Sequence, residues 1–371
     1  MAAHPMPDPA DAYAATYAEA RVKFAGAARA RGCDVESHEH PRVRGAQGET
    51  LAMDVAVLGR GDAPALLVLT SATHGVEGFC GSGAQVGLLR DDAFVSAAGA
   101  AGVDVAFVHA VNPFGFSHLR RTNEDNVDLN RNFRDFSTPP PPNTAYAEVH
   151  ALVVPPTWPP APGHEARIAA YVDARGARAW QTAVSSGQCE FPDGLFYGGT
   201  KPAWSNTTLR AVLRRLGAGR RRIGWIDFHT GLGPCGHGEK IYMGEGDAAS
   251  IERARSAFGA DVTSYLDGSS TSAKLTGVVY RAALDECPEA ELTAIALEVG
   301  TLDLAAVLDA LRADQWLANG GDAPPAQRAA IKRAIRDAFY VDRTDWKAMV
   351  WAQARVAGLQ AVRALAREGT R

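Results

Sequence analysis

Residues 65–83 read ALLVLTSATHGVEGFCGSG. The first part, Ala65 to Thr70, is a short apolar run rich in Leu and Val that ends at a turn signal, which is the pattern of a buried strand. His74 and Glu77 follow where such a strand would leave its sheet. Open α/β sheets place ligand sites at the carboxyl ends of their strands. We therefore predict that His74 and Glu77 are two ligands of a catalytic zinc ion.

The bulk composition is that of an ordinary soluble globular protein. Of 371 residues, 46% are hydrophobic and 22% are charged, which suits one large α/β domain or two smaller ones. The formal net charge is −4 and basic residues form no block, so we expect no nucleic-acid partner. No apolar run approaches the length of about 18 residues that a membrane span needs, so we expect no membrane association.

The N-terminal residues and the cysteines indicate a cytoplasmic protein. The first 25 residues lack the apolar core of a secretory signal. The five cysteines are odd in number, scattered, and form no C-x-x-C pair, so neither a disulfide framework nor a Cys-rich zinc site is expected. The sequence carries no signal for a particular oligomeric state.

Apolar periodicity predicts the remaining elements. A helix starting at 84–90 between strands 65–70 and 103–110 makes a β-α-β unit, so part of the sheet should be parallel. Residues 51–58 alternate and are expected to pair with 65–70 as a hairpin closed at 59–62. The other predicted elements are strands at 222–228, 241–244 and 293–299 and helices at 10–31, 164–186, 207–216, 303–318, 326–339 and 346–367.

Two segments between these elements lack periodicity. Residues 112–132 crowd polar side chains together, as functional loops do. Residues 138–163 are rich in proline, which removes ladder donors and breaks helices, so we expect a surface insertion there. No repeat or composition shift marks a boundary, and residues 1–371 are expected to form a single domain.

Three predicted strands end in a side chain that can bind a metal ion or carry a proton. His229 follows strand 222–228 and Glu298 ends strand 293–299. A catalytic zinc takes three protein ligands and leaves a fourth position for water, which His74, Glu77 and His229 would fit. Attack by a zinc-bound water also needs a base, and Glu298 is our candidate. Each pattern alone is common, but packing does not explain their joint occurrence, because unpaired buried charges cost several kcal/mol.

Five motifs occur in a fixed order along the chain: HGVEG at 74–78, NPFGF at 112–116, VDLNRNF at 127–133, DFHTGLG at 227–233 and LEVGT at 297–301. In this order they resemble the M14 zinc carboxypeptidases and their relatives, the succinylglutamate desuccinylase/aspartoacylase group. The chain looks closest to the DUF2817 branch. The resemblance implies a single zinc-hydrolase domain with one zinc ion per chain. It also implies a three-layer α/β/α fold around a central mixed, mostly parallel twisted sheet.

The resemblance also implies roles for individual residues. His74, Glu77 and His229 match the zinc ligands. Glu298 matches the glutamate that acts as general base and then as general acid. Tyr280 matches a mobile tyrosine that covers the substrate, and the alternative for this residue is a tyrosine packed in a loop.

Further residues of loop 112–132 match the substrate contacts of the family. Asn130 and Arg131 match the pair that grips the substrate carboxylate, a task that suits the guanidinium fork. Asp128 matches an aspartate bonded to the first zinc histidine, which fixes the tautomer of that ring. An upstream arginine stabilises the oxyanion in the family. Arg121 is our first choice for it and Arg120 the second.

The implied activity is hydrolysis of an amide bond next to a free carboxylate in a peptide or small-molecule substrate, as in a metallocarboxypeptidase. An N-acyl amino acid deacylase is the alternative, because no side-chain specificity pocket can be located in the sequence. A catalytically silent carboxylate-binding protein is a third possibility, against which Glu298 argues. The G-x-G-x-x-G match at 231–236 contains Pro234 and precedes no predicted helix, which argues against a dinucleotide site.

Overall fold

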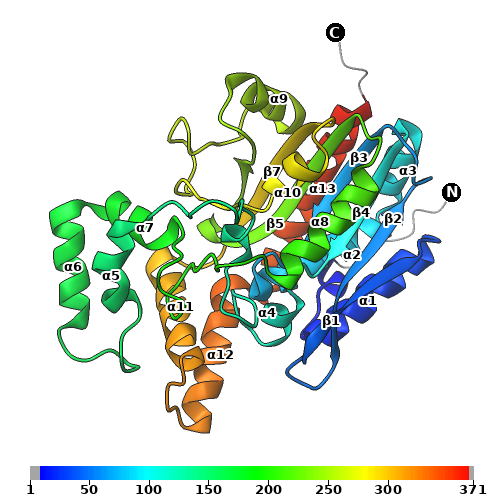
Figure 1. Ribbon diagram of the computed structural model, residues 1–371. Helices are drawn as coiled ribbons and strands as arrows, with labels where there is room; N and C mark the ends of the chain where they lie inside the picture. Colours follow the sequence, from blue (N-terminus) through cyan, green and yellow to red (C-terminus); the bar gives the residue numbers. More distant parts are fainter. Residues whose placement is uncertain (1–8, 367–371) are drawn as a thin grey trace.

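A seven-stranded sheet organises the chain, with helices packed against both of its faces (Figure 1). The computed structural model describes residues 9–366. The strands are β1 Val35–Arg44, β2 Thr50–Leu58, β3 Ala65–Thr70, β4 Val103–His109, β5 Arg222–Cys235, β6 Gly238–Tyr242 and β7 Glu291–Gly300. Across the sheet they follow the order β1-β2-β4-β3-β5-β7-β6.

The central strands run parallel and the outer strands run antiparallel to their neighbours. β4, β3, β5 and β7 are parallel, as the β-α-β pattern predicts. β1 and β2 at one edge and β6 at the other pair antiparallel. The mixed sheet of the predicted α/β fold is confirmed. Because β3, β5 and β7 point the same way, their carboxyl ends meet at one edge of the sheet.

The hairpin expected between residues 51–58 and 65–70 is wrong. β2 pairs with β1 and β4, and β4 lies between β2 and β3. All six residues of β3 are buried, so this strand needs a neighbour on each side in the sheet interior, and β4 and β5 fill these places. A turn signal between two strands shows that the chain turns, but not which strand becomes the partner.

The helices confirm most of the predicted pattern and add to it. The three helices of the tail form where the sequence indicates, whereas the helix after β3 begins at Gly78, before the predicted start at 84. The helix expected over 10–31 begins only at Tyr17, where the Thr16 side chain accepts the Glu19 N–H as a cap. Over residues 9–366 the helices are α1 Tyr17–Ala30, α2 Gly78–Arg90, α3 Asp92–Ala101, α4 Pro113–Ser117, α5 Thr144–Val153, α6 His164–Arg175, α7 Ala177–Ser185, α8 Trp204–Gly217, α9 Ala248–Phe258, α10 Arg281–Glu286, α11 Leu304–Ala318, α12 Pro325–Phe339 and α13 Thr344–Ala366, with 3-10 turns η1 Pro9–Ala12, η2 Gly75–Glu77 and η3 Leu129–Arg131.

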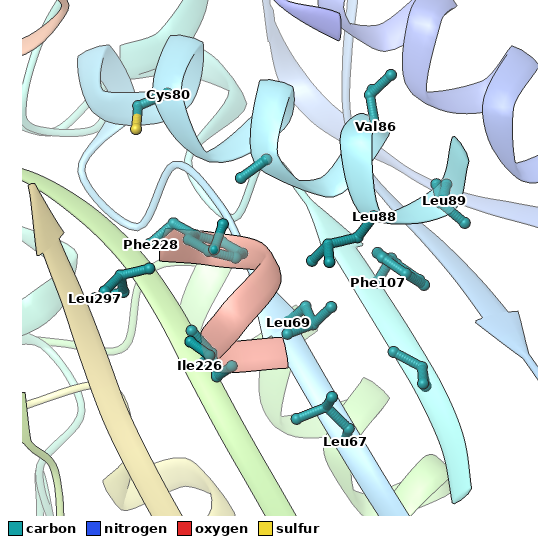
Figure 2. Close-up of a cluster of buried hydrophobic side chains, with 14 of the residues drawn as sticks. Leu67, Leu69, Cys80, Val86, Leu88, Leu89, Phe107, Ile226, Phe228 and Leu297 are labelled. Atoms are coloured by element: carbon teal, nitrogen blue, oxygen red, sulfur yellow. The ribbon is translucent and has the colours of Figure 1, made fainter. Parts of the chain in front are cut away.

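Two helical layers sandwich the sheet. Leu67, Leu69 and Ile226 point from β3 and β5 towards the layer formed by α2 and α13, and Leu88 of α2 lies over Leu69 (Figure 2). Alternate residues of β3, such as Leu66, face α8 and α10 on the opposite side of the sheet. This alternation gives β3 two buried faces and makes it the centre of the three layers.

A third group of helices lies beside the sandwich. Figure 1 shows α5, α6 and α7 next to α11, at the edge where the central strands end. α5 falls inside the proline-rich residues 138–163, where no helix was expected, and its Tyr146 and Val149 are fully buried. They share an apolar cluster with Trp180 of α7 and Val307 of α11. Within residues 9–366, no helix combines the length and apolarity needed to cross a lipid bilayer.

Candidate metal centre

His74, Glu77 and His229 meet at the carboxyl edge of the sheet. His74 immediately precedes η2, Glu77 ends it, and His229 lies in β5. All three side chains are buried, and their possible ligand atoms lie within 4.8 Å of one another. The Nδ1 atoms of His74 and His229 are 3.2 Å apart, and the Glu77 carboxylate oxygens lie 2.9 Å and 3.0 Å from them.

An aspartate stands behind each histidine. Asp128 Oδ1 lies 3.2 Å from Nε2 of His74, and Asp227 Oδ2 lies 2.6 Å from Nε2 of His229. A histidine that ligates through one ring nitrogen needs a partner for the proton on the other nitrogen. Asp227 supplies it for His229, whereas at Nε2 of His74 Asp128 shares the position with the Arg121 guanidinium, and both Nδ1 atoms face Glu77.

The donor set fits a zinc ion. Two imidazole nitrogens and one carboxylate are the ligands of many catalytic zinc sites, and imidazole with carboxylate is also acceptable to other transition metals. Burial on its own would raise the pKa of Glu77, but His74 and His229 hold it well below its usual value. The carboxylate therefore stays ionised, as a ligand must.

Glycine is required next to the first ligand. A Cβ on Gly75 would lie 2.2 Å from the carbonyl carbon of Gly115 in the NPFGF motif, so the two motifs touch backbone to backbone. The N–H of Gly75 donates to the Arg121 carbonyl and that of Val76 to the Arg120 carbonyl. These bonds fix the HGVEG turn against the loop that carries Arg121, Asn130 and Arg131.

Glu298 lies beside the three ligands. It is paired in register with His229 on the neighbouring parallel strand, and its Oε1 accepts the Leu232 N–H at 3.1 Å. Burial and the nearby Glu77 carboxylate raise the pKa of Glu298 to about 8. A carboxyl group with such a pKa can exchange a proton near neutral pH.

Of the two candidate arginines, only Arg121 lines the cavity at the site. Its Nε donates to Asp128 at 2.9 Å, and its Nη1 and Nη2 lie 3.3 Å from Glu77 Oε1 and 2.7 Å from His74 Nε2. Arg120 points away and pairs with Asp314 of α11 at 3.1 Å. Although the two arginines are adjacent in sequence, Arg121 lies at the site and Arg120 connects the loop to α11.

Arg131 is a buried cation at the same cavity. Its Nε and Nη2 donate to the Ser185 carbonyl and its Nη1 to the Asn130 carbonyl. Burial lowers the pKa of Arg131 to about 10. The Asn130 side chain accepts the Val279 N–H at 2.9 Å. Both residues line the cavity, as a pair that grips a carboxylate requires.

Tyr280 also lines the cavity and comes directly before α10. Its hydroxyl donates to the Gly244 carbonyl at 2.9 Å. The structure thus places the ring at the wall of the cavity, with its hydroxyl held by the main chain. All predicted site residues except Arg120 surround one space of about 170 Å³ or, like Asp128, contact a residue that does.

Two residues of the site were missed by the sequence prediction. Asp227 had a readable signal, because it lies two residues before His229 and therefore on the same face of one strand. Phe196 had none. Its ring lies 5.0 Å from the Arg121 guanidinium and 5.5 Å from that of Arg131, although its φ of 53° is uncommon for a bulky residue.

Solved structures with a similar chain path include three carboxypeptidase-related proteins. Bovine thrombin-activatable fibrinolysis inhibitor, solved with a tick carboxypeptidase inhibitor, is 13% identical, with a TM-score of 0.49 over 95% of this chain and 97% of that chain. Carboxypeptidase A from Helicoverpa armigera is 12% identical, with a TM-score of 0.44 over 86% of this chain and 73% of that chain. A metallo-carboxypeptidase from Burkholderia cenocepacia is 14% identical, with a TM-score of 0.39 over 87% of this chain and 68% of that chain.

Sequence comparison places the chain in a family. No curated protein matches it in sequence. The family model described as "Protein of unknown function (DUF2817)" matches residues 13–353, which is nearly the whole chain. The branch that the order of the five motifs predicted is confirmed, and this protein belongs to the DUF2817 family.

Proposed function

We propose that this protein is a zinc-dependent hydrolase that cleaves an amide bond next to a free carboxylate. The observation that supports the proposal most strongly is the meeting of three kinds of group at one cavity. These are the His74, Glu77 and His229 donor set, the carboxyl group of Glu298, and the buried guanidinium of Arg131.

The three donor residues would hold the ion. When bound, zinc supplies a Lewis acid that polarises a carbonyl group and makes water more acidic. Asp128 and Asp227 keep the two imidazole rings in the orientation and tautomer that metal binding needs. The proposed metal centre thus draws its residues from three separate segments of the chain.

Glu298 would move the proton. As a general base it takes a proton from the attacking water, and as a general acid it returns that proton to the nitrogen that leaves. Burial raises the pKa of Glu298, which favours the protonated form that the second step needs. The Leu232 N–H donates to Oε1 of Glu298. Because this bond holds the carboxyl group in place, it also sets the orientation of Oε2.

Arg131 and Asn130 would orient the substrate. A guanidinium binds a carboxylate through two parallel hydrogen bonds, which fixes the position of the neighbouring amide. Arg121 would stabilise the negative charge that develops on the amide oxygen. For that it must share its guanidinium between the substrate and its present partners, Asp128 and Glu77.

Two variants of the proposal differ in the group removed. In a metallocarboxypeptidase-like reaction the acyl side is a peptide, and in a deacylase it is a simple N-acyl group. A silent carboxylate-binding protein would need Arg131 but not Glu298, and the placement of Glu298 beside the ligands favours an enzyme.

The test begins with metal content. We expect one zinc ion per chain in protein purified without chelator, loss of amide hydrolysis with o-phenanthroline, and recovery with added zinc. Glu298→Gln should keep the metal and lower kcat by roughly 10²- to 10⁴-fold. Protein that binds well below one equivalent of any divalent ion, or a Glu298→Gln variant as fast as the parent, would contradict the proposal.

A further inference from the structure

The cavity carries its charges at one end only. Apart from six residues at that end, the lining side chains are uncharged. Arg121 already contacts the carboxylates of Asp128 and Glu77, whereas Arg131 has only main-chain carbonyls as hydrogen-bond partners among the described residues. The cavity therefore offers one unpaired cation to a substrate. The six charged or ionisable residues are His74, Glu77, Arg121, Arg131, His229 and Glu298.

Two apolar walls extend from this charged end. One is formed by α7 and α11, and the other by β6, β7 and the chain before α10. In the second wall Ile241 and Ala296 face each other in register on adjacent strands. The apolar lining residues of the α7–α11 wall are Trp180, Val184, Leu304, Val307, Leu308 and Leu311, and those of the β6–β7 wall include Ile241, Met243, Val278 and Ala296.

The polar atoms of these walls are already used inside the protein. The hydroxyl groups of Ser185, Thr230 and Tyr280 donate to main-chain carbonyls, and those of Tyr242 and Ser272 do the same. The Gln181 amide donates to the Thr271 carbonyl. Tyr265 has the one lining hydroxyl without such a bond in the part of the chain that the structure describes. The side chains of the α7–α11 wall thus offer few free hydrogen-bond donors to the amide groups of a peptide.

The two walls differ in how far they reach. Leu304, in the first turn of α11, lines the cavity and is 49% exposed, so the α7–α11 wall continues to the surface. Ile241, Met243 and Ala296 in the other wall are all buried. A long group suits the open wall and a compact group suits the closed one.

We propose that the substrate is an N-acyl amino acid with a single carboxylate, an apolar side chain and an aliphatic acyl group. The inference rests on the hydrolase proposed above and names its substrate class. The carboxylate would pair with Arg131, the side chain would pack between Ile241 and Met243, and the acyl chain would follow α11 towards Leu304. Hydrolysis breaks the acyl C–N bond: the hydroxyl of water goes to the acyl carbon and the remaining proton goes to the amine.

Other substrate classes fit the cavity less well. A peptide along the α7–α11 wall would bury amide groups without partners, and each such group costs free energy. A dicarboxylate such as an N-acyl glutamate would bring a second negative charge into a cavity whose other arginine is already paired. The apolar lining therefore favours an N-acyl amino acid over a peptide as the substrate.

The experiment compares four amides with the zinc-loaded full-length protein: N-acetylphenylalanine, N-octanoylphenylalanine, N-octanoylglutamate and a phenylalanine dipeptide. Because a buried methylene is worth about 0.8 kcal/mol, kcat/KM should rise by up to about fourfold for each added methylene of the acyl chain. We expect N-octanoylglutamate and the dipeptide to be at least ~100-fold poorer than N-octanoylphenylalanine, because each buries an unpaired polar group. Preference for the dipeptide or the glutamate derivative would overturn the substrate class.

A pair of variants locates the acyl chain. Leu308→Glu places a carboxylate on the α7–α11 wall and should lower the ratio of octanoyl to acetyl turnover by more than ~10-fold. Val356→Glu makes the same change on α13, where Val356 is 49% exposed, and should leave the ratio as it is. An unchanged ratio in Leu308→Glu would place the acyl chain elsewhere and refute the assignment.

Binding tests the inference independently of turnover. In zinc-loaded Glu298→Gln protein, calorimetry should show N-octanoylphenylalanine binding more tightly than N-acetylphenylalanine and N-octanoylglutamate. If no amide is cleaved but this order of affinity is found, the hydrolase is wrong and the ligand class holds. If amides are cleaved and the order is reversed, the ligand class is wrong and the hydrolase holds.

Discussion

Asp227 Oδ2 lies 2.6 Å from His229 Nε2, two residues apart on the same face of β5. The other oxygen of Asp227 accepts the hydroxyl groups of Thr70 and Thr73 at 2.6 Å and 2.9 Å. Asp227 thus joins the end of β3 to the interior of β5, and these two segments lead to the first and the third proposed ligand. It is fully buried and does not line the cavity, so its influence on a bound metal ion would pass through His229.

Asp227→Asn should weaken metal binding by roughly 10- to 100-fold, because the amide holds the His229 ring and its proton less firmly. Competition with a chelator of known affinity measures the change. Asp104→Asn is the matched control: Asp104 is a buried carboxylate on β4 that pairs with Arg220 at 2.6 Å, away from the site. It should lower the melting temperature and leave the metal affinity unchanged. Equal metal affinity in both variants would remove Asp227 from the centre.

Arg131→Ala should lower kcat/KM for substrates with a free carboxylate by roughly 10- to 100-fold, since a hydrogen bond to a charged group contributes about 1.5–3 kcal/mol. The corresponding C-terminal amides should lose much less. Arg120→Ala serves as control, because Arg120 is next to the site in sequence but pairs with Asp314. A similar loss for acids and amides in Arg131→Ala would refute the carboxylate contact.

Gly75→Ala should lower both stability and metal affinity. The added Cβ would lie 2.2 Å from Gly115 backbone, which cannot move aside as a side chain would. Overpacking of this kind costs typically 1–3 kcal/mol. Gly99→Ala is the opposite case, since nothing lies within 4 Å of the added carbon on the surface of α3, and it should stabilise the protein by roughly 0.5–1 kcal/mol. Thermal unfolding and metal titration of both variants check the pair.

Phe196→Leu should raise KM for carboxylate substrates several-fold and change kcat less. The aromatic face lies within 5.5 Å of both Arg121 and Arg131, and a cation–π contact contributes about 0.5–2 kcal/mol. Phe196→Tyr keeps the ring and should behave as the parent does. If Leu and Tyr at this position give the same kinetics, the ring orients neither arginine, and its role is limited to packing.

Acid should destabilise the protein through His109. Burial lowers the pKa of His109 to about 4 from the value of 6.5 of a solvent-exposed histidine. Between these two pH values the unfolded chain therefore binds more protons than the folded chain. The free energy of unfolding should therefore fall as the pH drops from 6.5 to 4, by roughly 3 kcal/mol at most. His109→Leu should flatten this part of the pH profile relative to the parent. Exposed His237, changed to Gln, should leave it unchanged; a parent-like slope in His109→Leu would contradict the assignment.

The sequence by itself determined where the candidate site lies. His74, His229 and Glu298 each follow a short apolar run, and the run alone identifies a buried strand. Parallel strands end at the same edge of a sheet, so local signals were sufficient to bring these residues together. Asp128 and Arg131 were assigned only by the resemblance of the ordered motifs, VDLNRNF at 127–133 among them, to those of the zinc carboxypeptidase family.

Only the tertiary structure decided which strands are neighbours, which side chains contact each other and which residues form the walls of the cavity. Residues 51–58 carry a strand pattern that does not encode β1 and β4 as neighbours. Arg120 and Arg121 are equivalent in sequence, and the packing of the loop on α11 separates them. Phe196 and the α7–α11 wall arise from contacts between distant segments. Periodicity records whether a residue is buried, whereas the identity of what buries it depends on the whole fold.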